Sequence, residues 1–101
     1  MQPHQISVQE LKLLTDRKEN FFLLDVRNPD EHQLFNLGGT LIPLSELAQR
    51  VNEIPRDVPV IIYCHSGYRS GVAQELLQSI GIKDVKNLMG GVVAWQQLVK
   101  N

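Results

Sequence analysis

The chain has only one cysteine among its 101 residues, Cys64. A single thiol excludes an internal disulfide, and it leaves an oxidised Cys64 without a resolving thiol in its own chain. Proteins that rely on disulfides belong to oxidising compartments, so this cysteine usage fits a reducing one. We therefore expect a cytoplasmic protein.

Neither sign of charge is in marked excess, and long apolar runs are scarce. Lysine and arginine number 10 against 11 aspartates and glutamates, no basic run occurs, and the formal net charge is −1. The electrostatic footprint of a nucleic-acid-binding protein is therefore missing. The N-terminal MQPHQISVQELK has neither a basic region followed by an apolar one nor a span of about 20 apolar residues. We expect no export signal, no membrane anchor and no nucleic-acid partner.

Metal ligands at a recognisable spacing are missing as well. His4, His32 and His65 show no spacing, to one another or to Cys64, of the kind that metal sites use. We expect neither a bound metal nor another cofactor.

What the sequence does contain is typical of an ordinary globular domain. Hydrophobic residues make up 43% of the chain and charged residues 21%. A chain of this length buries a single core and has little room for a separate regulatory module. No internal repeat, low-complexity tract or linker interrupts it, so we expect one domain over residues 1–101.

Apolar runs and amphipathic segments alternate along the chain. The apolar runs predict strands over residues 21–27, 40–44, 58–64 and 85–89. Helical spacing of apolar residues predicts helices over residues 6–18, 28–35, 44–54 and 92–99, and a further helix that ends at Gly81. Ser7 and Glu10 form a capping-box pattern near the start of the first helix. The alternation predicts an α/β fold, in which right-handed crossovers place helices on both faces of a parallel sheet.

Two chemically distinctive residues lie at the C-terminal ends of predicted strands. Asp25 lies near the end of the run FFLLDVR, and Cys64 ends VPVIIYC. Ligands of open parallel α/β sheets bind outside the carboxyl ends of the strands. We therefore expect a site at this edge of the sheet, with Cys64 at its centre.

The segment CHSGYR, from Cys64 to Arg69, joins a buried strand to the start of a helix. Unpaired backbone N–H groups and the positive end of the helix dipole meet there, and such a site lowers the pKa of a thiol. Gly67 can adopt positive φ, so that successive N–H groups converge on the sulfur, and Arg69 adds positive charge for an anionic substrate. The alternative is that Cys64 only fills the core. That role requires neither Gly67 nor Arg69.

Three separated segments, LLDVRNPDEH, CHSGYRS and NLMGGVVAWQQL, resemble the single-domain rhodanese family of sulfurtransferases. The resemblance implies a rhodanese-like fold with a central five-stranded parallel sheet. It implies that Cys64 forms a persulfide and that the loop formed by His65, Ser66, Gly67, Tyr68 and Arg69 binds the substrate, while Asp25 and Ser70 support the site. The segment LFNLGGTLIP departs from the family's usual Gly-His-Ile-Pro-Gly-Ala pattern, which puts substrate contacts from that side in question.

The expected reaction moves a sulfane sulfur from an anionic, thiosulfate-like donor to a thiol or to cyanide, with a protein as a further possible acceptor. One alternative is a sulfur-relay or regulatory module that acts on a protein partner. A second is a cysteine phosphatase or arsenate reductase, whose signature is Cys-x5-Arg. The sixth residue after Cys64 is Ser70 and the arginine is Arg69, so this loop is one residue short of that signature.

Several neighbours of these motifs have two possible roles. His65 is either a general base or part of the rim of the site. Tyr68 either forms a wall of the pocket, which we favour, or packs on a neighbour. We expect Arg27 to form a structural ion pair and Trp95 to belong to the core. Gly90 and Gly91 are expected to form a turn.

Overall fold

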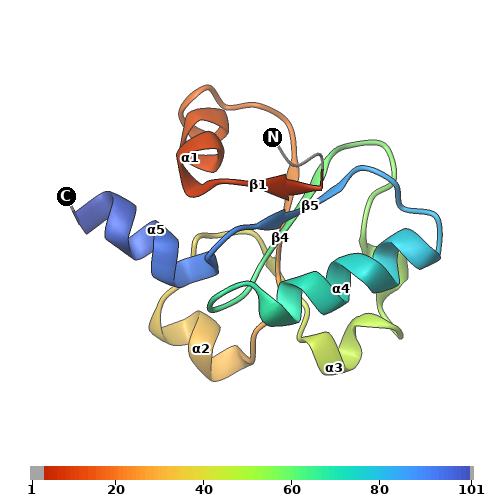
Figure 1. Ribbon diagram of the computed structural model, residues 1–101. Helices are drawn as coiled ribbons and strands as arrows, with labels where there is room; N and C mark the ends of the chain where they lie inside the picture. The colour runs from red at the N-terminus through yellow and green to blue at the C-terminus, as the bar shows by residue number, and fades with distance from the viewer. Residues whose placement is uncertain (1–3, 101) are drawn as a thin grey trace.

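The structure is a computed structural model and describes residues 4–100. Five strands alternate with helices along the chain (Figure 1). In order, the elements are β1 Gln5–Ile6, α1 Val8–Asp16, β2 Phe22–Asp25, α2 Pro29–Leu34, β3 Thr40–Leu41, α3 Leu44–Leu47, the 3-10 helix η1 Val51–Glu53, β4 Val60–Tyr63, α4 Tyr68–Ser79, β5 Val85–Leu88 and α5 Gly91–Lys100.

The strands form one parallel sheet in the order β1-β5-β4-β2-β3. The central strand β4 is buried at all four positions, which explains why its sequence, VIIY, lacks any alternation of apolar and polar residues. The predicted α/β fold with a five-stranded parallel sheet is confirmed.

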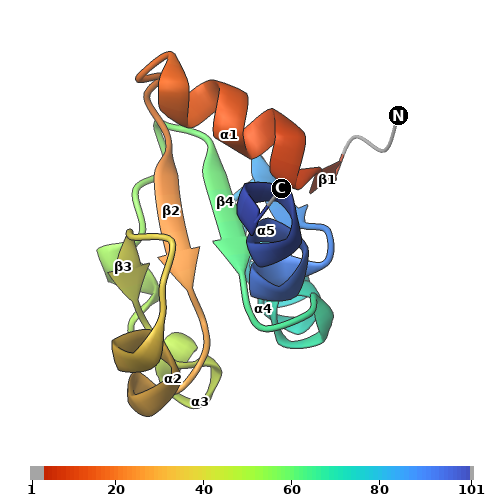
Figure 2. The ribbon, with the colours of Figure 1, turned by 90° about the vertical axis from the view of Figure 1, so that its left-hand side faces the viewer.

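Helices cover both faces of the sheet, as the sequence predicted (Figures 1 and 2). On one face, α3 and α4 pack against inward-facing residues of the central strands, among them Leu24 and Ile62. On the other face, α1 and α5 pack against a second cluster that includes Ile61 and Tyr63. In Figure 2, β2 and β4 point toward the end of the molecule where α2 and the first turn of α4 lie. Within residues 4–100, no helix has the length and apolar character needed to cross a membrane.

The first helix, expected over residues 6–18, is shorter at both ends and spans Val8–Asp16, and its first expected residue belongs to a strand. Ile6 pairs with Leu88 at the edge of the sheet, and Ser7 caps α1. The predicted capping box is present: the Ser7 hydroxyl accepts from the N–H of Glu10, and the Glu10 carboxylate accepts from the N–H of Ser7. A strand of two residues shows no periodicity, so the sequence pattern did not reveal β1.

The predicted helix over residues 44–54 is wrong as a continuous element. The α-helix ends at Leu47, and a separate 3-10 helix spans Val51–Glu53. Leu47, Val51 and Ile54 nevertheless all contact the core. The apolar spacing thus correctly predicted burial, although the backbone between these residues is not one helix. Similarly, β3 covers only Thr40–Leu41 of the strand expected over residues 40–44.

Candidate active site

Cys64 lies immediately after β4, at the carboxyl edge of the sheet. Asp25 ends the neighbouring strand β2 and pairs in register with Tyr63, so both predicted site residues lie at the same edge. Gly67 caps α4 with φ of +116°, and the helix begins at Tyr68. The positive φ expected at Gly67 is therefore observed. Cys64 is 1% exposed, so its thiol is buried beneath the loop that follows it.

A backbone N–H and a hydroxyl group lie within hydrogen-bond distance of the sulfur. The N–H of Gly67 donates to Cys64 Sγ at 3.1 Å, and the Ser70 hydroxyl lies 3.3 Å from the same atom. Burial favours the neutral thiol, but hydrogen bonds from the Ser70 side chain and from the backbone of Ser70, Gly67 and Ser66 outweigh it. Together they hold the pKa of Cys64 below its ordinary value. The loop is thus built to stabilise a negative charge on sulfur.

The shape of this loop depends on the start of α5. The N–H groups of Val92 and Val93 donate to the carbonyls of Cys64 and His65 at 3.0 and 3.1 Å. Because these two carbonyls point toward α5, the peptide N–H groups that follow are free to face the sulfur. Gly91 permits the approach, since a Cβ at this position would lie 2.4 Å from the Cys64 carbonyl oxygen. Gly91 therefore supports the loop; Gly90 lies in the predicted turn, whereas Gly91 is already the first residue of α5.

The remaining loop residues differ in exposure. His65 and Ser66 are exposed at the surface. Tyr68 is 80% exposed, so its ring stands in solvent rather than forming the enclosing wall that we favoured. Ser70 is fully buried next to Cys64, in the supporting position expected from the sequence.

Arg69 is engaged by a partner that the sequence analysis missed. Its guanidinium donates to both carboxylate oxygens of Glu31 on α2, at 2.7 and 2.8 Å. The hydrogen bonds from Arg69 lower the pKa of Glu31 to about 2, and the same contact raises the pKa of Arg69. Glu31 is therefore ionised at neutral pH and offsets the positive charge that we had assigned to substrate attraction.

Asp25 and Arg27 form a buried ion pair that braces α2. Asp25 is 0% exposed and Arg27 is 3% exposed, and their closest charged atoms are 2.8 Å apart. Burial opposes ionisation of Asp25, but hydrogen bonds from Arg27 and His32 hold its pKa below the ordinary value. Arg27 also donates to the carbonyls of Glu31 and Phe35. The expected structural role of Arg27 agrees with these contacts, which fix the helix that carries Glu31.

The segment that departs from the family pattern is held by Tyr63. The Tyr63 hydroxyl accepts from the N–H of Leu37 at 3.1 Å and donates to the carbonyl of Gly38 at 3.0 Å. Burial raises the pKa of Tyr63 to about 12, so the hydroxyl keeps its proton. Gly39 passes so close to β2 that a Cβ there would lie 2.4 Å from the carbonyl oxygen of Leu23. In this structure the segment packs against the sheet.

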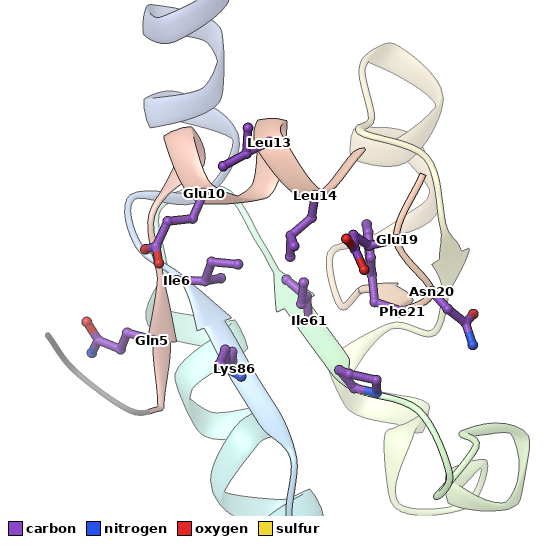
Figure 3. A pocket seen from close by; sticks show the side chains of 11 residues that line it. Gln5, Ile6, Glu10, Leu13, Leu14, Glu19, Asn20, Phe21, Ile61 and Lys86 are labelled. Atoms are coloured by element: carbon purple, nitrogen blue, oxygen red, sulfur yellow. The ribbon is translucent and has the colours of Figure 1, made fainter. Parts of the chain in front are cut away.

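A pocket of about 400 Å³ lies elsewhere, between α1 and the sheet (Figure 3). Apolar side chains of Ile6, Leu14 and Ile61 point into it, and Glu10 and Lys86 lie at its margin. None of its lining residues belongs to the loop from Cys64 to Ser70. The pocket is therefore separate from the site around the thiol.

Comparison with known proteins places this geometry in a family. A family model described as Rhodanese-like domain matches residues 7–98. The chain is 44% identical over 79 residues to the uncharacterized protein YqhL of Bacillus subtilis, and it covers 63% of that protein. It is 35% identical to the putative sulfur carrier protein YrkF of the same organism, of which it covers 50%. The chain thus spans about half to two thirds of the length of these two relatives.

Other relatives are matched over most of their length. A sulfurtransferase of Allochromatium vinosum is 36% identical, and the alignment covers 91% of this chain and 87% of that protein. The crystal structure of a rhodanese-related protein from Thermoplasma volcanium superposes with a TM-score of 0.82 at 27% identity, covering 94% of this chain and 92% of that one. The chain therefore belongs to the family of rhodanese-like domains, which includes sulfurtransferases and sulfur carriers.

Proposed function

We propose that the protein is a sulfurtransferase that carries sulfane sulfur as a persulfide on Cys64. The observation that carries this proposal is the convergence of the Gly67 N–H and the Ser70 hydroxyl on a buried sulfur, at 3.1 and 3.3 Å. A core-filling cysteine needs no such polar neighbours, whereas a negative charge on sulfur, in a thiolate nucleophile or a persulfide anion, requires hydrogen-bond donors beside it. The family's sulfurtransferases and sulfur carriers support the same function.

The proposed reaction has two steps. In the first, the Cys64 thiolate attacks the outer sulfur of the donor, a new S–S bond forms, and the donor's own bond to that sulfur breaks. With thiosulfate, the leaving group is sulfite and the enzyme retains a persulfide anion. In the second step, a thiolate or cyanide attacks the outer sulfur, and the electron pair of the broken S–S bond returns to Cys64 as thiolate. No redox cofactor is needed for this balance.

The loop supplies the binding surface in this proposal. The backbone N–H groups of Ser66 and Gly67 stabilise charge on sulfur, and the exposed side chains of His65 and Tyr68 form the rim that a substrate meets first. Ser70 supports Cys64 from within, and Asp25 fixes α2 through Arg27. His65 acts as a rim residue, since the lowered pKa of the thiol leaves little need for a neighbouring base.

A second candidate is a sulfur relay that exchanges sulfur with a protein partner. The pairing of Arg69 with Glu31 favours this reading, because it reduces the positive charge available to a free dianion such as thiosulfate. The relative YrkF, named a putative sulfur carrier, supports it as well. Both candidates use the same persulfide on Cys64 and differ only in the donor and the acceptor.

A phosphatase or arsenate reductase fits the loop less well. The arc from Cys64 to Arg69 is one residue shorter than Cys-x5-Arg, and a tetrahedral oxyanion needs more N–H donors around a wider ring than one sulfur atom does. In addition, Arg69, which would have to bind the oxyanion, is paired with Glu31.

Intact-mass spectrometry after incubation with thiosulfate tests the proposal. The expected result is a gain of one sulfur atom that cyanide or a thiol removes. Cys64→Ser should show no gain while keeping the wild-type melting temperature, because the hydroxyl is similar in size but does not ionise in this site. If thiosulfate gives no gain but a low-molecular-weight persulfide does, the relay is favoured. If neither donor loads wild-type Cys64, the sulfurtransferase proposal is wrong.

A further inference from the structure

Asn87, on strand β5, makes two side-chain hydrogen bonds directly beneath the active-site loop. Its Nδ2 donates to the carbonyl of Gly67 at 3.1 Å, and its Oδ1 accepts from the Ser70 hydroxyl at 2.5 Å. Ser70 Oγ is in turn 3.3 Å from Cys64 Sγ. A continuous chain of contacts therefore runs from β5 through Ser70 to the sulfur.

The direction of these hydrogen bonds follows from the groups involved. A carbonyl oxygen only accepts, so the Gly67 carbonyl must face the Asn87 amide nitrogen, which turns Oδ1 toward Ser70. Ser70 must then donate its single hydroxyl proton to Oδ1. When Cys64 is a neutral thiol, its S–H can donate to Ser70 Oγ, and all three groups are satisfied.

A thiolate at Cys64 changes this arrangement because it can only accept. Two acceptors, Cys64 Sγ and Asn87 Oδ1, then compete for the single hydroxyl proton of Ser70, which can form a hydrogen bond to only one of them at a time. A hydrogen bond to the charged sulfur is the stronger of the two, so ionisation of Cys64 draws the hydroxyl away from Asn87.

We propose that Asn87 is a positioning residue that competes with the Cys64 sulfur for the Ser70 hydroxyl proton and releases that proton when negative charge develops on the sulfur. This inference rests on the proposed role of Cys64 as the sulfur carrier. In the persulfide, charge resides mainly on the outer sulfur, and Ser70 donates to Asn87. When an acceptor thiolate takes the outer sulfur, the S–S electron pair returns to Sγ, and the Ser70 O–H rotates to stabilise the leaving thiolate.

Other charged groups near the sulfur do not take part in this competition. They are Arg69 with Glu31 of α2, and Asp25 with Arg27 at the end of β2, together with the exposed His65 in the loop. Variants at Ser70 and Asn87 leave all of them in place, so a coupling between these two residues is not an effect of altered charge.

A double-mutant cycle on the alkylation of Cys64 tests the inference. The pH midpoint of iodoacetamide alkylation is measured for wild type, Ser70→Ala, Asn87→Leu and the double variant, with urea unfolding as a check on folding. Ser70→Ala removes a donor and should raise the midpoint in both backgrounds. In the Asn87→Leu background, Ser70 can donate to the thiolate without giving up a hydrogen bond to Asn87. The effect of Ser70→Ala on the thiolate-to-thiol ratio should therefore be larger in that background than in wild type, by about threefold or more.

The sign of the coupling separates competition from simple support. If Asn87 only holds Ser70 in place, Ser70→Ala should have an equal or smaller effect in the Asn87→Leu background, and either result would overturn the proposal. Gln74→Leu is the matched control, because the Gln74 side-chain amide, also on α4, donates to the carbonyls of His4 and Val85 rather than to the hydroxyl of Ser70. The effect of Ser70→Ala should be unchanged in that background. If Asn87→Leu does not fold, Asn87→Ala replaces it in the cycle.

Alkylation requires no sulfur donor, which keeps this test separate from the proposed function. Failure of Cys64 to gain sulfur from any donor would overturn the sulfurtransferase proposal while leaving the Ser70–Asn87 coupling measurable. Conversely, a coupling of the wrong sign would remove the role of Asn87 and leave sulfur transfer by Cys64 intact.

Discussion

The guanidinium of Arg69 and the carboxylate of Glu31 face each other through two hydrogen bonds of 2.7 and 2.8 Å, which join α4 to α2 beside the thiol. The planar fork of arginine matches the two carboxylate oxygens, so the pair is held in one geometry. Each side chain is about 30% exposed. The loop after Cys64 thus carries an arginine whose charge is largely offset, which bears directly on the proposed use of an anionic donor.

Removal of the Glu31 charge should improve the use of anionic donors. In Glu31→Gln, Arg69 is no longer neutralised, so we expect the KM for thiosulfate to fall by about threefold or more and to depend more steeply on salt. Steady-state kinetics at two ionic strengths measure both effects. Glu75→Gln, on the exposed side of α4, removes the same charge away from the site and should change neither. An unchanged KM in Glu31→Gln would show that Arg69 does not attract the donor.

The same pair should contribute to stability in a defined pH window. The pKa of Glu31 is about 2 in the folded protein against an ordinary value of 4.5, so its contribution is fully present above about pH 4.5 and is lost as the pH falls toward 2. We expect Glu31→Gln to lower the free energy of unfolding by about 1–2 kcal/mol at neutral pH, after allowance for solvent screening. Urea denaturation at several pH values should show this difference shrinking below about pH 4.5. A difference that is constant with pH would contradict the assignment.

Cys64 should ionise more readily than an ordinary thiol. Its pKa is lowered by the surrounding hydrogen bonds, so the pH midpoint of alkylation should lie below that of a model thiol, which is about 8.5. Denaturation in urea should return the midpoint to that of the model thiol, because only the folded chain places hydrogen-bond donors around the sulfur. Equal midpoints in the folded and denatured protein would contradict the proposal that these hydrogen bonds stabilise the Cys64 thiolate.

Gly91→Ala should damage the loop more than a comparable substitution elsewhere. Its Cβ would lie 2.4 Å from the Cys64 carbonyl oxygen, and both backbones must shift. We expect a loss of about 3 kcal/mol in unfolding free energy and a higher alkylation midpoint for Cys64. Gly38→Ala is the control: it also has positive φ, but a Cβ there meets nothing within 4 Å. That control should cost about 1 kcal/mol and leave the thiol unaffected.

Lengthening the loop should weaken sulfur transfer. A glycine inserted between Tyr68 and Arg69 creates a Cys-x5-Arg spacing and moves Ser70 away from the sulfur that it now approaches at 3.3 Å. We expect sulfurtransferase activity to fall by at least about tenfold, since each lost donor is worth on the order of 1–3 kcal/mol. Thiosulfate kinetics and phosphate binding are measured on a variant with an unchanged melting temperature. Full activity with no gain in oxyanion binding would refute the argument from loop size.

The central features of the fold and site were predictable because they leave local signals. A buried parallel strand produces an uninterrupted apolar run, which identified β4, and the change from VIIY to CHSGYR marked its carboxyl end. Gly67 was recognisable because a loop that turns its N–H groups toward one atom needs positive φ, which the structure shows at +116°. These inferences depend on neighbours in sequence.

The partners of these residues were not predictable, because they are distant in the sequence. Glu31 and Arg69 are 38 positions apart, and Ser70 and Asn87 are 17 apart. Glu31 in the first turn of α2 resembled any N-terminal acid of a helix, and it does also accept from the N–H of Asn28. Asn87 followed an ordinary strand pattern. The sequence therefore located the thiol but not the side chains that govern its charge.

The contact between α5 and the carbonyls of Cys64 and His65 also has a consequence for biosynthesis. The residues that orient the loop, Gly91 to Val93, follow Cys64 by more than twenty positions, so they leave the ribosome after it. Until α5 docks, its N–H groups do not hold these two carbonyls away from the sulfur. We therefore expect the pKa of Cys64 to fall below its ordinary value only after α5 has docked.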